Sequence, residues 1–79
     1  MPAAGRVRIL GIDPGSLRLG YGVIDRVDSA RLAYVECGVI AAPARMPRPE
    51  RLTVIGRSLR ELVDELRPDE VAIEQAFYG

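Results

Sequence analysis

The sequence predicts an α/β fold with a mixed four-stranded sheet in the order 3-2-1-4. Two apolar runs of strand character, residues 7–13 and 70–74, each end in an acid, and a helical pattern lies before the second. Short turns make the first three strands antiparallel in succession. The helix is a crossover, so the fourth strand runs parallel to the third and therefore to the first.

Residues 7–13 are predicted to form a central strand of this sheet. The run is apolar on both faces up to Ile12, then carries Asp13 and breaks at Pro14-Gly15. An acid at the C-terminal end of a central strand lies in the crevice where open α/β sheets bind ligands. Asp13 could instead serve only to begin the turn, because Asp before Pro-Gly does so readily.

Two further strands are predicted before the helix, at residues 19–24 and 32–40. Gly20 and Gly22 fall on one face of the first of these, which suggests close approach by another backbone or a ligand. Glu36 makes one face of the strand at residues 32–40 less apolar, which favours a place for this strand at the edge of the sheet.

One helix is predicted from about residue 50 to residue 67. Pro49 suits a first helical turn, and Arg67-Pro68 marks the end. Its apolar residues recur at helical spacing and form one stripe: Leu52, Ile55, Leu59, Leu62, Val63 and Leu66.

Composition excludes several kinds of site. The chain has no histidine, which removes histidine bases and argues against structural zinc, so a metal would be held by oxygen, as Mg²⁺ or Mn²⁺ are. The formal net charge is zero and all eleven cations are arginines, so binding to a polyanion would need local patches. The single cysteine, Cys37, fits a reducing cytoplasm and is expected to be a buried, small apolar residue, while Tyr21 and Tyr34 are expected to pack against the sheet. No apolar run approaches membrane-spanning length.

The two strand-ending acids, Asp13 and Glu74, are expected at the same edge of the sheet. If the fourth strand lies beside the first, their backbones are about 4.8 Å apart and both carboxylates could share one cation. The fourth strand could instead flank the third. Mg²⁺ typically uses only one or two protein carboxylates, but a second ion would need at least one more ligand.

Seventy-nine residues make at most one domain. Central strands that are apolar on both faces need cover on both, and only one helix is predicted. We therefore expect residues 1–6 to be a disordered tail and residues 7–79 to be the N-terminal part of a single domain whose missing helices lie downstream.

Three motifs taken together resemble the N-terminal half of a RuvC-type Holliday junction resolvase. They are residues 11–16 (Gly-Ile-Asp-Pro-Gly-Ser), residues 20–24 (Gly-Tyr-Gly-Val-Ile) and residues 72–77 (Ala-Ile-Glu-Gln-Ala-Phe). The resemblance implies a ribonuclease H-like nuclease fold and a Mg²⁺-dependent, or Mn²⁺-dependent, endonuclease. Such an enzyme would act in the cytoplasm as a homodimer on four-way DNA junctions during recombination and repair, with branch-migration proteins as partners.

The resemblance also assigns roles to residues. Asp13 would be the shared metal ligand and catalytic acid, Glu74 the second acid, and Phe77 an aromatic that stacks on junction bases, although Phe77 could instead be a core residue. Ser16, Arg45 and Arg48 are the remaining candidates for DNA contact, and the arginines could equally be solvated. The family places further acids and its dimer-forming helix beyond Gly79, so the metal site and the dimer are expected to be incomplete within residues 1–79.

Two other function classes stay open. The Asp-x-Gly turn between glycine-bearing strands also resembles the phosphate loop of actin-like and sugar-kinase ATPases. The fold could also serve only protein interaction, as a non-catalytic module. ATP binding would single out the first alternative, and metal binding at Asp13 and Glu74 would argue against the second.

Overall fold

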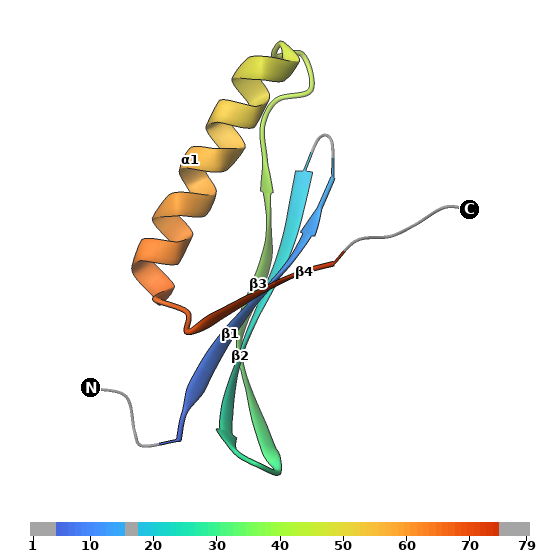
Figure 1. Cartoon of the computed structure of the whole chain (residues 1–79). Coiled ribbons are helices and arrows are strands. Elements are labelled where there is room, and N and C mark those ends of the chain that lie inside the picture. The colour runs from blue at the N-terminus through green and yellow to red at the C-terminus, as the bar shows by residue number, and fades with distance from the viewer. Residues whose placement is uncertain (1–4, 16–17, 75–79) are drawn as a thin grey trace.

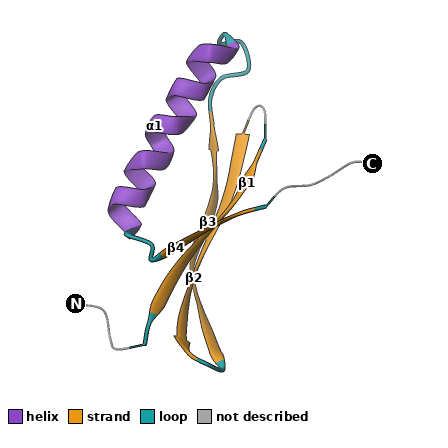
Figure 2. Cartoon of the chain, in the orientation of Figure 1, coloured by secondary structure: helices purple, strands orange, loops and turns teal. Residues whose placement is uncertain are grey.

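The structure of the chain, a computed structural model, describes residues 5–15 and 18–74 (Figure 1). It is a four-stranded sheet with one helix packed against it (Figure 2). The elements in chain order are β1 (Val7–Pro14), β2 (Arg18–Asp28), β3 (Arg31–Ala41), α1 (Arg48–Leu66) and β4 (Glu70–Ile73). The sheet order is β3-β2-β1-β4, which confirms the predicted ribonuclease H-like arrangement.

The strand β1 lies in the middle of the sheet, as its apolar character predicted. It pairs antiparallel with β2 and parallel with β4, so the fourth strand flanks the first and not the third. The ribbon shows β4 crossing back from the end of α1 to lie along β1 (Figure 1).

The β2–β3 hairpin is longer than the sequence predicted, and each of its strands has eleven residues. The strand predicted to end at residue 24 continues to Asp28, and Asp25 in this extension has a partner on β1. Its carboxylate accepts hydrogen bonds from Arg8 Nε at 2.9 Å and Nη2 at 3.1 Å. The chain reverses only after Asp28, whose carboxylate accepts the N–H of Ala30 at 2.8 Å.

The helix α1 begins two residues earlier than predicted and ends one residue earlier. Proline stands in its first turn, where a missing N–H costs nothing. At the other end Arg67 adopts a left-handed conformation with φ 49°, and its N–H donates to the Val63 carbonyl at 2.8 Å. The predicted stop before Pro68 is therefore confirmed.

The core lies on one face of the sheet, which we call the helix face. Leu10 and Val23, partners across β1 and β2, are fully buried there, and α1 contributes the buried side chains Ile55 and Leu66. Burying a side chain of this size stabilises a fold by about 1.5–3 kcal/mol. This packing fixes β1 and β2 against the helix.

The opposite side of the sheet, the open face, carries Gly20 and its β3 partner Val39, and no described element covers it. Val39 is 60% exposed and Tyr34 is 72% exposed. The prediction that Cys37 is buried is wrong: it is exposed on this face, where its Sγ accepts a long hydrogen bond from the Tyr34 hydroxyl at 3.5 Å. The expectation that Tyr34 packs against the sheet fails for the same reason.

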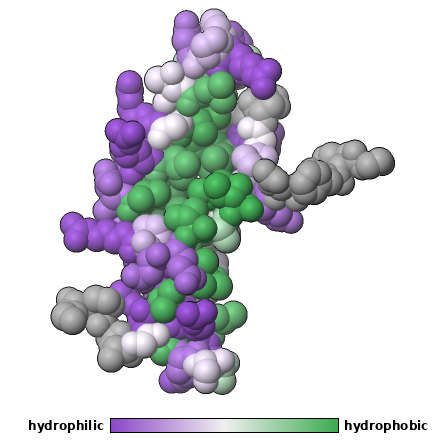
Figure 3. All heavy atoms as spheres, in the orientation of Figure 1, coloured by the Kyte–Doolittle hydropathy of each residue, from purple (hydrophilic) through white to green (hydrophobic). Residues whose placement is uncertain are grey.

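The space-filling view shows an apolar band along the middle of the molecule, beside the polar outer surface of α1 (Figure 3). Within residues 5–15 and 18–74, no helix is long and apolar enough to cross a membrane.

Candidate metal centre

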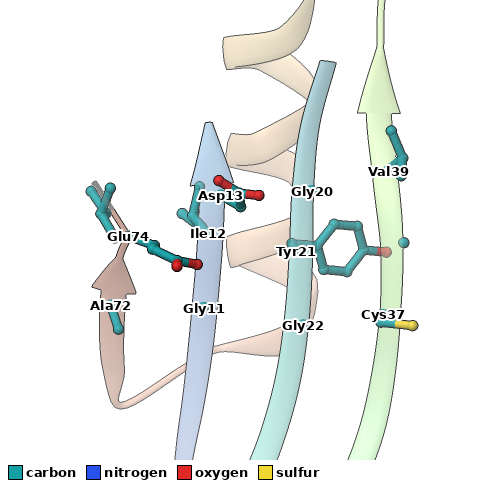
Figure 4. A pocket seen from close by; sticks show the side chains of 12 residues that line it. Gly11, Ile12, Asp13, Gly20, Tyr21, Gly22, Cys37, Val39, Ala72 and Glu74 are labelled. Atoms are coloured by element: carbon teal, nitrogen blue, oxygen red, sulfur yellow. The ribbon is translucent and has the colours of Figure 1, made fainter. Parts of the chain in front are cut away.

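Asp13 and Glu74 lie side by side at the ends of two adjacent strands. Ile12 is the register partner of Ile73, so each acid comes one residue after this pair. The pairing continues into the site, because the Glu74 N–H donates to the Ile12 carbonyl at 2.9 Å. The close-up shows both carboxyl groups over β1 (Figure 4). The expected adjacency of the two strand ends is therefore present.

Both acids belong to the open face of the sheet. A Cβ added to Gly20 would lie 3.9 Å from the Asp13 Cβ, which places the Asp13 side chain on the same side as Gly20. Strand side chains alternate, so Glu74 shares its face with Ala72, the register partner of Gly11. The acids consequently face away from the core packed against α1.

A shallow hollow of about 670 Å³ lies beside the acids on the open face. Glycines at 11, 20 and 22 form its floor. A Cβ at Gly11 would be 3.8 Å from the Gly22 carbonyl oxygen, and one at Gly22 would meet nothing within 4 Å. No crowding among the described residues therefore requires glycine here. Its effect is to leave the backbone bare next to the carboxylates. The rest of the lining is Ile12, Asp13, Tyr21, Cys37, Gly38, Val39, Ala72, Ile73 and Glu74.

Tyr21 borders this hollow through its backbone but sends its ring toward β3 (Figure 4). The ring lies so close to Gly38 that an added Cβ there would be 2.9 Å from the Tyr21 hydroxyl oxygen. That hydroxyl donates to Glu36 at 2.9 Å, and this bond to a carboxylate raises the pKa of Tyr21. Tyr21 packs against the core, as expected.

The two acids have no cationic partner within the part of the chain that the structure describes. The ion pairs found there join Asp25 to Arg6 and Arg8, and Asp28 to Arg31. Two neighbouring carboxylates repel each other unless a cation lies between them. Exposed oxygen ligands of this kind suit Mg²⁺ or Mn²⁺. Among residues 5–15 and 18–74, no third His, Cys, Asp or Glu joins the pair to make a fuller cluster.

Of the other predicted site residues, Arg45 and Arg48 are not among those that line the hollow beside the acids. Arg45 is exposed in the loop before α1, and Arg48 is exposed at the start of α1. The start of α1 and the loop before it lie on the helix side of the sheet, at the end of the molecule toward which β1 runs (Figure 1). Ser16 and Phe77 lie outside the described residues.

Sequence reasoning missed a polar cluster at the other end of β1. Arg8 Nη1 donates to the Leu66 carbonyl at 3.0 Å, in addition to the Asp25 bonds. The Arg8 N–H donates to the Asp69 carboxylate at 2.7 Å. Arg8 and Asp69 stand 61 positions apart, and no local pattern pointed to this contact.

The family model for crossover junction endodeoxyribonuclease RuvC matches residues 9–79. The chain is 44% identical over 73 residues to a crossover junction endodeoxyribonuclease RuvC of Chloroflexus aggregans. That match covers 92% of this chain and 44% of the relative, so the chain spans less than half of the relative's length.

Solved structures agree with the sequence match. The chain is similar to a T. thermophilus RuvC in complex with Holliday junction substrate, with a TM-score of 0.74 and 32% identity over 91% of this chain and 45% of that one. It shares a fold with the Aquifex aeolicus PPX-GPPA enzyme, with a TM-score of 0.65 over 86% of this chain and 26% of that one, at only 15% identity. The part of β1 from Ile9 onward, Asp13 near its end and the motif after α1 all fall within the matched residues, and the chain belongs to the crossover junction endodeoxyribonuclease RuvC family.

Proposed function

We propose that the protein carrying this chain is a Mg²⁺-dependent endonuclease that cleaves four-way DNA junctions in recombination and repair. The observation that carries the proposal is that the carboxylates of Asp13 and Glu74 lie at neighbouring strand ends on the open face and have no cationic partner among the described residues. Membership of the RuvC family supports it, as does a relative solved with a Holliday junction substrate. By the same likeness we infer a homodimer that works with branch-migration proteins in the cytoplasm, and Mn²⁺ as a substitute ion.

In this proposal Asp13 and Glu74 hold the metal, and residues 7–79 form the N-terminal part of one nuclease domain. A bound divalent ion would supply a positive charge that polarises the phosphodiester and lowers the pKa of water. The chain itself contributes by positioning the two acids. Asp13 lies in β1, which has partner strands on both sides, so its backbone has little freedom. The glycine floor beside it leaves room on the open face.

We propose that Ser16, Arg45 and Arg48 contact the DNA backbone and that Phe77 stacks on bases at the junction. Two observations support the arginines. Both are exposed, and the first turn of α1, where Arg48 lies, has no side-chain cap on its N–H groups. Uncapped helical N–H groups favour anions, and arginine forks match phosphate oxygens.

The central test is Asp13→Asn, made in a protein that carries this chain at the full length of its relatives. We expect junction cleavage with Mg²⁺ to be lost, because the amide keeps the size of the side chain but removes the charge that holds the ion. Junction binding without metal should persist, since phosphate contacts supply most of the affinity. Asp64→Asn, an exposed acid on α1, is the matched control and should cleave normally.

The same assays test the proposed DNA contacts. An Arg45→Ala, Arg48→Ala double variant should bind junctions more weakly and with a shallower salt dependence. Phe77→Ala should weaken junction processing without loss of thermal stability. Wild-type cleavage by Asp13→Asn would contradict the assignment, and an unchanged salt slope would exclude the arginines.

The remaining function classes gain no specific support. The likeness to the PPX-GPPA enzyme, at 15% identity, extends to the fold alone, so it gives no reason to prefer ATP chemistry. A non-catalytic interaction module would show no metal binding that depends on Asp13 and Glu74, and the cleavage assay with Asp13→Asn separates it from a nuclease.

A further inference from the structure

The strand β4 brings Glu74 to the site, yet its own side chains hold it weakly in register. It has only four residues, Glu70–Ile73, and all of them are exposed. Val71 is 51% exposed and Ile73 is 64% exposed, so neither is locked into the core. A strand whose apolar residues are not buried specifies its register poorly.

The register nevertheless decides whether the metal centre exists. Side chains alternate along a strand, so a shift by one residue would move Glu74 to the helix face, away from Asp13. A shift by two residues would restore the face but displace Glu74 by about 6.6 Å at 3.3 Å per residue. Glu74 could then no longer share an ion with Asp13.

Asp69, immediately before β4, makes two hydrogen bonds to one residue of β1. Its carboxylate accepts the Arg8 N–H at 2.7 Å, and its own N–H donates to the Arg8 carbonyl at 2.8 Å. Both main-chain groups of Arg8 are therefore bound by a single residue. This closed pair is possible in only one alignment of the two strands, the one in which Ile9 is the partner of Glu70.

The side chain of Arg8 also binds the start of the segment that connects α1 to β4. Its Nη1 donates to the carbonyl of Leu66, the last residue of α1, and its Nε and Nη2 bind Asp25 on β2. Only residues 67–69 separate α1 from β4. The end of the helix and the first residues of β4 are thus both anchored to one position on β1.

We propose that Asp69 is a positioning residue: its closed pair with Arg8 sets the register of β4 and so places Glu74 beside Asp13. The inference rests on the proposed metal-dependent function of that pair. Asp69 itself stands at the far end of β4 from the acids and touches neither of them.

Two conservative variants distinguish the effect of the length of the Asp69 side chain from the effect of its charge. Asp69→Asn keeps an oxygen at the same distance from the Arg8 N–H but loses the charge, whereas Asp69→Glu keeps the charge but lengthens the side chain by one methylene. Register control predicts that Asn behaves like the wild type and Glu does not. An electrostatic role predicts the reverse. Asp69→Ala removes the bond outright, and Asp64→Ala, an exposed acid on α1, is the control.

The measurements use a protein that carries this chain at the full length of its relatives. We expect Asp69→Ala and Asp69→Glu to raise the Mn²⁺ concentration for half-maximal junction cleavage by about tenfold or more, as loss of residues that orient ligands does. The Glu74 amide, bound to the Ile12 carbonyl, should exchange its hydrogen faster, while amides of the β2–β3 hairpin keep their protection. Junction binding without metal should not change.

The proposal would be overturned if Asp69→Ala cleaved junctions with the same Mn²⁺ dependence as the wild type and kept the Glu74 amide protected from hydrogen exchange. The proposal would also be overturned if Asp69→Ala lost hydrogen-exchange protection throughout the β2–β3 hairpin together with junction binding. The same holds if Asp69→Asn needed more Mn²⁺ for cleavage while Asp69→Glu behaved like the wild type. If Asp69→Ala does not fold, the Asn and Glu variants decide alone. Failure of the proposed function would appear differently, as absence of metal-dependent cleavage in the wild type, and Glu74 hydrogen exchange would still test the register.

Discussion

The ion pair of Arg8 and Asp25 shows how one residue can serve several elements. Asp25 is only 7% exposed, and its carboxylate takes two hydrogen bonds from the Arg8 guanidinium. The hydrogen bond from Arg8 holds the pKa of Asp25 below its ordinary value, against the opposing effect of burial. Because the folded-state pKa is the lower one, the pair stabilises the fold above the unfolded value, about 3.9, and this contribution is lost as the pH falls through the folded-state pKa.

Replacing Asp25 with Asn should therefore reduce the acid sensitivity of the fold. At pH 7 the variant should be less stable by roughly 1–3 kcal/mol, because Arg8 keeps a part-buried charge without its counter-charge. The gap should narrow as the pH falls below about 4, because the Asp25 carboxyl group of the unfolded chain then takes up its proton before that of the folded protein does. Urea unfolding followed at several pH values measures both effects. An equal gap at pH 7 and pH 3 would show that the pair does not control acid stability, and Asp64→Asn should leave the pH profile unchanged.

The helix α1 depends on packing more than on its own signals. Pro47 precedes it without a side-chain cap, and no basic residue stands in its last turn to complement the helix dipole. Its stability comes from Ile55 and Leu66 on the helix face. Gly56, next to Ile55, adds a further weakness, because glycine in a helix interior costs about 0.5–1 kcal/mol relative to alanine.

Alanine at two glycines should consequently have opposite effects. Gly56→Ala should raise the free energy of unfolding by about 0.5–1 kcal/mol, since a Cβ there meets nothing within 4 Å. Gly38→Ala should lower it by about 1 kcal/mol, the net value of a typical hydrogen bond, because the new Cβ displaces the Tyr21 ring from Glu36. Thermal unfolding of both variants measures the contrast, and a stabilised Gly38→Ala would show that Tyr21 moves aside without cost.

At the scale of the whole molecule, the sheet has one packed face and one bare face among the described residues. The open face presents Leu32, Tyr34 and Val39, each at least 60% exposed. Soluble monomers rarely leave contiguous apolar surface of this kind open, and its burial is worth about 25 cal/mol per Å².

The 79-residue chain on its own should therefore associate in solution. Sedimentation or light scattering over a range of concentrations should show a mass that rises above 8.6 kDa. Val39→Lys should suppress the association because it places a charge on the open face. Leu52→Lys is the matched control on α1, where Leu52 is 55% exposed, and it should not suppress association. A mass that stays monomeric at every concentration would contradict the expectation.

Several features could be predicted from the sequence because they depend on local pattern and on the geometry of connections. The apolar run that ends in Asp13 identified β1 as central, and the apolar stripe predicted α1 to within two residues. Short turns and one crossover then led to parallel strands β1 and β4, and so to two acids at the same edge. The three motifs pointed to the family.

Other features depended on contacts between residues far apart in the chain, and only the tertiary structure decided them. Asp25 extends the hairpin because Arg8 lies opposite it, and Cys37 is exposed because no described element covers its face. The register that brings Glu74 beside Asp13 is held by Arg8 and Asp69, which are 61 positions apart. The apolar run at residues 70–74 did not say which residues of β1 lie opposite it. The sequence thus determined which strands carry the acids, and long-range polar contacts decided that the acids meet.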